Sequence, residues 1–339
     1  MTIGSAPPVS WRANMFKVGD VEIQKRVLLG PMAGITTMSY REFMKPFGVG
    51  LSFSEMVSDC GIDFNNRRTF EYLKTSKIDT PVAIQLFGFS AENTTKAIKI
   101  IENEADFDIL DINLGCPVLK VTKTGAGSAW LKDRDKLRAY MKAVCETSSK
   151  PVSAKIRLGW DENSINVYEV SKDLEEAGVK LITIHCRTKA QGYSGIADYT
   201  KVANMKNVIS VPFAISGDIF TPQKAKEAID ITGADAVMVA RGGVGNPFLL
   251  TQINEYLETG NLLPDPNVKQ QAEWALEYAK KLCEEHGESV AMRELRGIIP
   301  HFFSGFPGYK KVRVQIASSL TTMDQLEKIL EGIKSREHC

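Results

Sequence analysis

Residues 107–117 read FDILDINLGCP, an apolar run that ends in a polar turn containing a cysteine. The run has the length and composition of a short strand that is buried on both faces. Asn113 and Cys116 follow it at its C-terminal end, which is where a parallel α/β barrel carries its active site. The loop that continues to Ala129, with its glycines and lysines, is therefore a candidate site.

Seven further apolar runs of this kind occur along the chain. They span residues 27–29, 51–56, 82–87, 152–158, 181–185, 211–215 and 236–239. Segments with helical periodicity separate them, among them 91–103, 133–147, 164–177 and 222–231, and several begin after Ser, Thr or Asp. Eight β/α units in about 240 residues are typical of a (β/α)8 barrel. The expected fold class is therefore α/β, with a TIM barrel over residues 14–255.

The sequence on either side of the barrel predicts the remaining organisation. Residues 16–23 (FKVGDVEI) predict a hairpin that closes the N-terminal mouth of the barrel. We expect a flexible N-terminus over residues 1–13 and a glycine- and proline-marked linker over 256–267. Strongly helical sequence follows, which predicts a C-terminal all-α domain over 268–339.

Composition and charge exclude several classes of protein. Lys and Arg number 42 and Asp and Glu 41, so any surface that binds nucleic acid has to be local. The six cysteines are scattered without metal-type spacing, and no run of residues has the pattern of a signal peptide or a membrane-spanning helix. We therefore expect a cytoplasmic monomer that binds no metal and no membrane.

Small and polar residues follow the other strands as well, at the rim that the C-terminal strand ends share. Those with a candidate role are Pro31, Met32, Ala33, Gln85, Lys155, Arg157, His185, Gly217, Asp218 and Arg241. Because barrel strand ends surround one pocket, we expect these residues to lie together. Gly217 and Arg241 follow the last two strands, where backbone N–H groups and a guanidinium suit a phosphate. The alternative to a phosphate site is that the glycines here are needed only for ordinary turns between strand and helix.

Three of the candidate residues also have purely structural alternatives. Lys155 needs an anionic or carbonyl partner in the barrel mouth, and a carboxylate on a neighbouring strand would meet the same need. His185, alone at a strand end, is compatible with a structural role. Cys116 could be a small buried hydrophobe, although its neighbours Gly115 and Pro117 favour an open loop. There the thiol could act as a nucleophile beside a base, or as an acid that stays protonated near neutral pH.

Nine motifs in order within residues 27–255 resemble those of the flavin-dependent tRNA-dihydrouridine synthases. They are PMAGIT, SEMVS, QLFG, DINLGCP, KTGAGSA, KIRLGW, TIHCRT, SGDI and VARGGVGNP. The resemblance implies an FMN-binding barrel, a tRNA-binding helical domain, and reduction of the C5=C6 bond of uridines in tRNA to 5,6-dihydrouridine. It also implies that a reduced nicotinamide, NADPH or NADH, regenerates the flavin.

The resemblance assigns roles to individual residues. The flavin ring would lie on Pro31, Met32 and Ala33, with Gln85, Lys155 and His185 beside it. The phosphate would be held around Ser216, Gly217, Asp218, Ala240 and Arg241. Asn113, Lys155 and Arg157 would hold the uracil, and Cys116 would protonate C5 from the face opposite the flavin after hydride transfer to C6. Ser216 departs from the family, which commonly has asparagine here, so an amide contact to the cofactor becomes a hydroxyl contact or disappears.

Contacts to tRNA would lie beside the barrel mouth and on the C-terminal domain. The candidates are Lys120, Lys123, Lys132, Arg293, Arg296, Lys310, Lys311 and Arg313. Residues 268–339 hold 11 Lys and Arg against 10 Asp and Glu, so a solvated helix face is the alternative to an RNA surface.

Two other functions remain open from the sequence. One is an FMN-dependent dehydrogenase that acts on a free base, of the dihydroorotate or dihydropyrimidine type. The extra helical domain argues against it, because an enzyme acting on tRNA needs contact area far beyond one base. The other is a barrel that binds RNA without catalysis, and the presence of Cys116, Lys155 and Arg157 argues against it.

Overall fold

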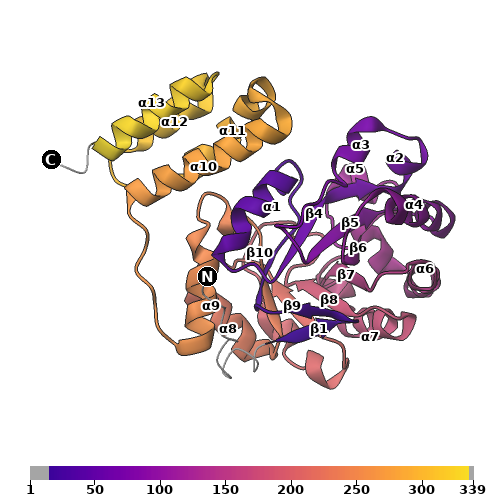
Figure 1. Ribbon diagram of the computed structural model, residues 1–339. Helices are drawn as coiled ribbons and strands as arrows, with labels where there is room; N and C mark the ends of the chain where they lie inside the picture. The colour runs from indigo at the N-terminus through magenta and orange to yellow at the C-terminus, as the bar shows by residue number, and fades with distance from the viewer. Residues whose placement is uncertain (1–14, 336–339) are drawn as a thin grey trace, which may run out of the picture.

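A closed barrel of eight parallel strands forms the centre of the molecule (Figure 1). The computed structural model describes residues 15–335, so the N-terminal segment expected over 1–13 lies outside the described part. The strands are β3 (Val27–Leu29), β4 (Leu51–Ser58), β5 (Val82–Phe87), β6 (Ile109–Asn113), β7 (Val152–Arg157), β8 (Leu181–His185), β9 (Phe213–Ser216) and β10 (Ala236–Val239). They follow one another around the barrel, and β10 pairs with β3 to close it. The predicted TIM barrel is confirmed.

Helices follow the strands and cover the outside of the barrel. They are α1 (Met38–Met44), α2 (Asp59–Asp63), α3 (Arg67–Glu71), α4 (Ala91–Glu104), α5 (Leu119–Thr122), α6 (Arg134–Thr147), α7 (Val167–Ala177), α8 (Pro222–Thr232) and α9 (Phe248–Thr259). Helix α7 begins three residues later than predicted, because residues 162–164 form a separate 3-10 turn that is capped by Asp161. In residues 15–335 no helix has both the length and the apolar character that crossing a membrane requires.

The barrel interior is a packed core that is closed at its N-terminal end. Strands β1 (Phe16–Val18) and β2 (Val21–Ile23) form the predicted hairpin. Val18 and Ile23 on this hairpin are fully buried with Phe53 and Met238 of the barrel strands. Because apolar side chains fill the N-terminal half of the interior and the hairpin covers that end, the C-terminal end is the place for a ligand.

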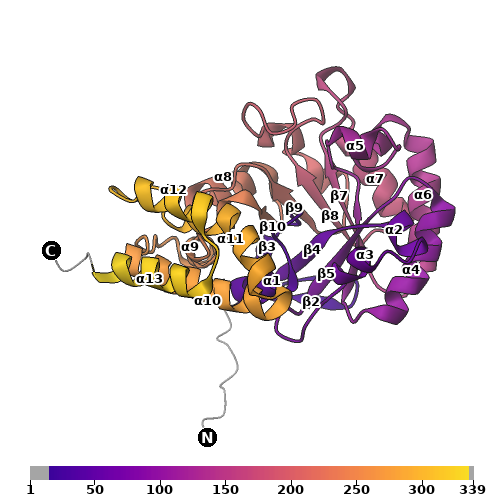
Figure 2. The ribbon, with the colours of Figure 1, turned by 90° about the horizontal axis from the view of Figure 1, so that it is seen from above.

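Four helices after the barrel form the predicted all-α region. They are α10 (Val268–His286), α11 (Glu288–Phe302), α12 (Lys310–Ser319) and α13 (Met323–Lys334). Figures 1 and 2 both place α10 beside α1, with α12 and α13 farther from the barrel. Helix α9 continues past the predicted start of the linker, until Gly260 ends it with a φ of 76°. The segment without regular structure therefore covers residues 260–267.

Aromatic packing joins the C-terminal helices to the barrel. The ring of Tyr278 on α10 lies 5.4 Å from the rings of both Tyr40 and Phe43 on α1, measured between ring centroids. A carboxylate oxygen of Glu285 accepts a hydrogen bond of 2.8 Å from the backbone N–H of Ser39. All three rings are buried, so the two parts of the chain share one hydrophobic core.

Removing this shared ring should loosen the C-terminal helices from the barrel. We expect Tyr278→Ala to lower the free energy of unfolding by about 3–5 kcal/mol, because it leaves a cavity in a buried aromatic cluster. Urea denaturation measures the loss, and limited proteolysis within residues 260–267 should become faster. Tyr278→Phe keeps the ring and serves as the control. Equal stability of the alanine variant and the wild type would contradict the shared core.

Candidate active site at the barrel mouth

A cavity of about 430 Å³ lies at the C-terminal end of the barrel strands. Its volume is in the range of small-molecule and cofactor sites. Of the residues predicted for the site, it is lined by Pro31, Met32, Ala33, Asn113, Cys116, Lys155, Arg157, His185, Ser216, Gly217, Asp218, Ala240 and Arg241. Residues that are more than two hundred positions apart in the sequence, such as Pro31 and Arg241, thus meet at one rim.

Gln85 is the one predicted site residue that does not line the cavity. Its side chain is fully buried, and its amide nitrogen donates to Asp111 at 2.5 Å while its oxygen accepts from the Asn113 amide at 2.8 Å. Burial raises the pKa of Asp111 to about 6, against the opposing effect of the hydrogen bonds from Gln85 and Ser153. Gln85 therefore orients the amide of Asn113 from beneath the cavity.

The loop that carries Cys116 is held closed by its own hydrogen bonds. The side-chain oxygen of Asn113 accepts from the backbone N–H groups of Gly115 at 3.2 Å and Cys116 at 2.9 Å. The N–H of Ser128 donates to the Cys116 carbonyl at 3.1 Å. Gly127 has a φ of 60°, and a Cβ there would lie only 2.9 Å from the same carbonyl oxygen. The returning backbone therefore comes very close to Cys116.

Cys116 is consequently only 6% exposed, and the expectation of an open loop is wrong. The sequence showed turn-forming neighbours but not the backbone of residues 126–128, which covers the thiol from a distance along the chain. Burial raises the pKa of the Cys116 thiol, and the Val118 N–H, Arg157 and Lys155 oppose this rise. A raised pKa keeps the proton on sulfur near neutral pH, which favours the acid over the nucleophile.

The raised pKa predicts slow alkylation of Cys116. Because iodoacetamide reacts with the thiolate, the reaction should be slow at pH 7 and should reach half its maximal rate only above the ordinary thiol pKa of about 8.5. Peptide mapping by mass spectrometry separates Cys116 from the other cysteines, and Cys116→Ala identifies its peptide. Rapid modification of Cys116 at pH 7 would show that the thiol is deprotonated there and would contradict its role as a general acid.

Lys155 reaches the cavity without a carboxylate partner. None of the ion pairs and side-chain hydrogen bonds found within residues 15–335 includes its ammonium, although Asp111 lies close enough to oppose the fall of its pKa. Burial, followed by the charge of Arg157, lowers the pKa of Lys155 to about 8. The alternative of an ion pair with a neighbouring strand is therefore not observed. A buried ammonium of this kind calls for a carbonyl or an anion from a ligand.

Arg157 ties together the loops that frame the cavity. Its guanidinium donates to the carbonyl oxygens of Gly115 at 2.8 Å, Thr188 at 3.0 Å and Gly192 at 2.8 Å. Burial lowers its pKa to about 10, so it remains charged at neutral pH. This arginine thus holds the Cys116 loop against the loop that follows β8, in addition to lining the cavity.

The loop after β9 brings glycine and an acidic side chain together. Gly217 has a φ of 115°, and a Cβ there would lie 2.9 Å from the imidazole of His185. The carboxylate of Asp218 accepts from Arg187 at 2.6 Å and from the Ala197 N–H at 2.9 Å. Burial alone would raise the pKa of Asp218, but these two hydrogen bonds hold it below its ordinary value. Gly217 is therefore required twice: its positive φ allows the turn, and the absence of a side chain allows the backbone to lie against His185.

Several residues at the rim were given no individual role from the sequence. Arg187 is buried and orients Asp218, and its only signal in the sequence was its position two residues after His185, at the end of the same strand. Tyr193 is 57% and Phe220 48% exposed, and the guanidinium of Arg241 lies 4.8 Å and 5.8 Å from their ring centroids. Both rings stand on loops, where no strand or helix periodicity marks a functional position.

Positive charge dominates the cavity. Burial lowers the pKa of His185 far below its ordinary value, and Lys155, Arg157, Arg187 and Arg241 lower it further, so the imidazole is neutral. These four cations around one neutral histidine favour an anionic ligand such as a phosphate.

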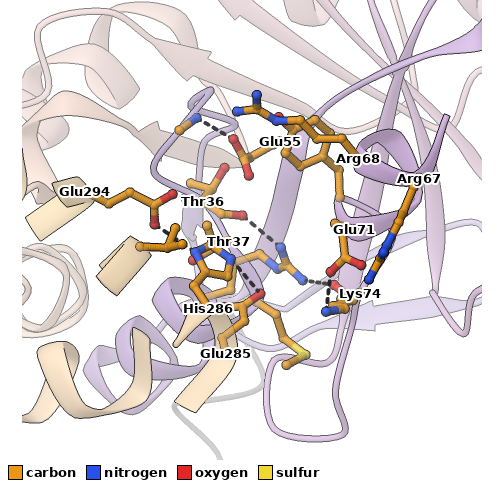
Figure 3. A pocket seen from close by; sticks show the side chains of 15 residues that line it. Thr36, Thr37, Glu55, Arg67, Arg68, Glu71, Lys74, Glu285, His286 and Glu294 are labelled. Atoms are coloured by element: carbon orange, nitrogen blue, oxygen red, sulfur yellow. Dashed lines mark hydrogen bonds and ion pairs between the residues drawn. The ribbon is translucent and has the colours of Figure 1, made fainter. Parts of the chain in front are cut away.

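A second cavity, of about 700 Å³, lies between the barrel and the C-terminal helices (Figure 3). Figure 3 shows Glu55 directed at the backbone of the neighbouring loop, where it accepts from the N–H of Gly34, and His286 paired with Glu294 at 2.8 Å. None of the predicted site residues lines this cavity, and charges of both signs are mixed in it. Residues 15–335 contain no cluster of three side chains suited to a metal ion. The predicted site residues are therefore concentrated in the first cavity.

Comparison with known proteins identifies the family of the chain. The family model "Dihydrouridine synthase (Dus)" matches residues 28–337. The chain is 35% identical to a probable tRNA-dihydrouridine synthase of Rickettsia conorii, with 94% of this chain and 96% of the relative covered. It is 31% identical to tRNA-dihydrouridine synthase B of Pseudomonas aeruginosa, with 96% and 98% covered.

Solved structures share the fold at low sequence identity. Histamine dehydrogenase from Rhizobium sp. 4-9 superimposes with a TM-score of 0.56 at 12% identity, over 81% of this chain and 51% of that chain. The old yellow enzyme homologue of Zymomonas mobilis gives 0.53 at 13% identity, over 74% and 94%. The match of the family model and of the relatives over nearly the whole chain decides the assignment. The chain belongs to the dihydrouridine synthase family and is a flavin-dependent oxidoreductase.

Proposed function

We propose that this protein is a tRNA-dihydrouridine synthase that binds FMN and reduces the C5=C6 bond of uridines in tRNA to 5,6-dihydrouridine, with NADPH as the reductant. One observation carries the proposal: the buried thiol of Cys116 and the ammonium of Lys155, which has no ion-pair partner within residues 15–335, line one cavity with residues 31–33. The names of the similar proteins supply the substrate, tRNA.

The cavity suits FMN on three grounds. Pro31, Met32 and Ala33 offer a wall of small or flexible side chains on which a flat ring can lie. Within residues 15–335 the ammonium of Lys155 has no ion-pair or hydrogen-bond partner, so it can meet a ring carbonyl. At the other end, the backbone at Gly217 and the guanidinium of Arg241 suit a phosphate, and Ser216, Asp218 and Ala240 complete that end.

The residues of the chain then have separate tasks in the reduction. When bound and reduced, FMN supplies a hydride to C6 of the uracil. Asn113, Lys155 and Arg157 hold the base, and the ammonium of Lys155 stabilises negative charge that develops on its carbonyl side. Cys116 gives its proton to C5, which is an act of general acid catalysis. The target uridine has to leave its stack in the folded tRNA to reach this cavity.

The C-terminal helices favour tRNA over a free base as the substrate, and we propose that they contribute RNA contacts. Arg293, Lys310 and Lys311 are exposed on α11 and α12. Arg296 is directed inward instead, since its guanidinium donates to the Leu320 carbonyl at 2.7 Å. The domain thus offers fewer free cations than its sequence suggested.

Neutralising two of these cations should weaken the binding of tRNA. We expect Lys310→Ala/Lys311→Ala to raise the Kd for tRNA several-fold at about 0.1 M salt, because each lysine that contacts a phosphate releases counterions. Flavin content should not change, because neither lysine lines the barrel cavity. An unchanged Kd in a gel-shift titration would leave the solvated helix face as the better interpretation.

A direct assay tests the proposed function. Purified protein is incubated with NADPH and tRNA transcribed without modifications, and nucleosides from the digested tRNA are analysed by mass spectrometry. We expect a yellow protein and the appearance of dihydrouridine. Reduction of free uracil or dihydroorotate chemistry, with no dihydrouridine in tRNA, would support the free-base dehydrogenase instead.

A further inference from the structure

Two lysines share a single tryptophan ring at the edge of the barrel mouth. The ammonium of Lys132 lies 3.6 Å from the ring centroid of Trp160, and that of Lys189 lies 4.2 Å from the same centroid. The three residues come from the segments that follow β6, β7 and β8. An ammonium over the face of an indole is attracted by the ring, so Trp160 holds both cations in place.

No carboxylate of the described chain neutralises this pair. Neither Lys132 nor Lys189 takes part in any ion pair within residues 15–335, whereas many other lysines at the surface do. Two acidic residues adjoin the three residues in sequence, and each has other partners. Asp161 accepts from the N–H of Asn163 and from the hydroxyl of Ser164. Asp133 forms an ion pair of 3.0 Å with Lys136. Two ammonium groups held at one ring repel each other, and an anion bound beside them offsets that repulsion.

The pair stands on the same loops that frame the active site. The N–H of Lys189 donates to the Gly159 carbonyl at 2.9 Å, and the N–H of Ala190 donates to the Trp160 carbonyl at 2.8 Å. Arg157, two residues before Gly159, binds the carbonyls on either side of this contact, at Thr188 and Gly192. The two lysines are therefore fixed in position relative to the wall of the cavity that holds Cys116.

We propose that Lys132, Trp160 and Lys189 form a binding site for a backbone phosphate of the tRNA beside the uridine that enters the cavity. This inference rests on the proposed function. Trp160 holds both ammonium groups at one place on the rim, and exposed Lys132 and partly exposed Lys189 leave that place open to a large anionic ligand. A phosphate contact fixes the position of the nucleic acid without reading its sequence. The site thus sets how the extruded nucleotide is placed over the barrel mouth.

The test compares Lys132→Ala/Lys189→Ala with a matched control, Lys99→Ala/Lys172→Ala, which removes the same charge from the outer helices α4 and α7. The Kd for unmodified tRNA is measured at several salt concentrations. We expect the first variant to bind about tenfold more weakly near 0.1 M salt and to reduce the slope of log Kd against log salt by about one. Its kcat at saturating tRNA should stay within about twofold of the wild type, because the contact places the substrate and takes no part in the chemistry.

Two further measurements complete the test. The first asks whether the bound anion is the phosphate of tRNA or that of NADPH, and the second asks whether the ring of Trp160 is needed. The KM for NADPH in flavin reduction without tRNA should not change, and a rise in that KM with an unchanged Kd for tRNA would overturn the proposal. Trp160→Ala, which keeps both lysines, should weaken tRNA binding because it frees them from their shared position. Equal effects of the two double variants would also overturn the proposal. A wild-type protein that forms no dihydrouridine would instead refute the proposed function.

Discussion

Replacing Cys116 by alanine should slow the formation of dihydrouridine by about 10²–10⁴-fold, the usual contribution of a positioned general acid. Binding of FMN and tRNA should change little, because the loop is held by the side chain of Asn113 and the backbone of Ser128 and does not depend on the thiol. The measurement is a single-turnover reaction of reduced enzyme with excess tRNA, followed by nucleoside analysis.

The control for this variant is Cys145→Ala, which removes a thiol from the outer helix α6. Its rate should match that of the wild type. Turnover of Cys116→Ala at the wild-type rate would remove the cysteine from the chemistry. Loss of bound flavin in the same variant would assign the thiol to cofactor binding.

The second large effect is expected at Lys155. Methionine keeps a long apolar side chain there but removes the ammonium, and we expect Lys155→Met to raise the Kd for FMN by about 10–100-fold. This corresponds to the loss of one hydrogen bond from a charged group, about 1.5–3 kcal/mol. Fluorescence titration of the apoprotein with FMN measures the change.

The lowered pKa of Lys155 adds a pH dependence with a defined sign. In the empty site the side chain is protonated below about pH 8 and neutral above it. Since the charged form binds the cofactor, affinity should fall as the pH rises through 8 in the wild type, whereas Lys155→Met should lack this step. Lys180→Met, on the exposed surface, serves as the control. Wild-type affinity of Lys155→Met for FMN at neutral pH would refute this role.

Short-range patterns in the sequence predicted the barrel well. Each strand is a short apolar run, and such runs are recognisable because parallel strands are buried on both faces. The predicted end of a strand differs from the observed one where a residue typical of turns is the last residue of the strand. Asn113, expected just after the fourth strand, is the last residue of β6 and pairs with Lys155 of β7.

Contacts between distant loops could not be predicted in this way. The burial of Cys116 depends on Gly127, and the orientation of Asp218 depends on Arg187 and Ala197. Neither dependence has a periodic signal in the chain. The exposed ring of Tyr193 escaped prediction because loop positions carry no pattern.

The same limit applies to the two lysines on Trp160. Lys132 was a candidate RNA contact from its sequence position, but its partnership with Lys189 joins segments that follow three different strands. The pairing of β6 with β7 and of β7 with β8 brings these segments side by side. The charge of the whole chain, nearly balanced, conceals such a local concentration of positive charge.

A crystal structure of the protein with FMN bound tests the central claim most directly. The account predicts the flavin ring against residues 31–33, with its phosphate near Gly217 and Arg241. The sulfur of Cys116 should then face the ring across a gap that a flat pyrimidine can fill. A flavin bound in the cavity between the barrel and the C-terminal helices would contradict the account. So would a Cys116 sulfur on the face of the flavin ring that lies against residues 31–33.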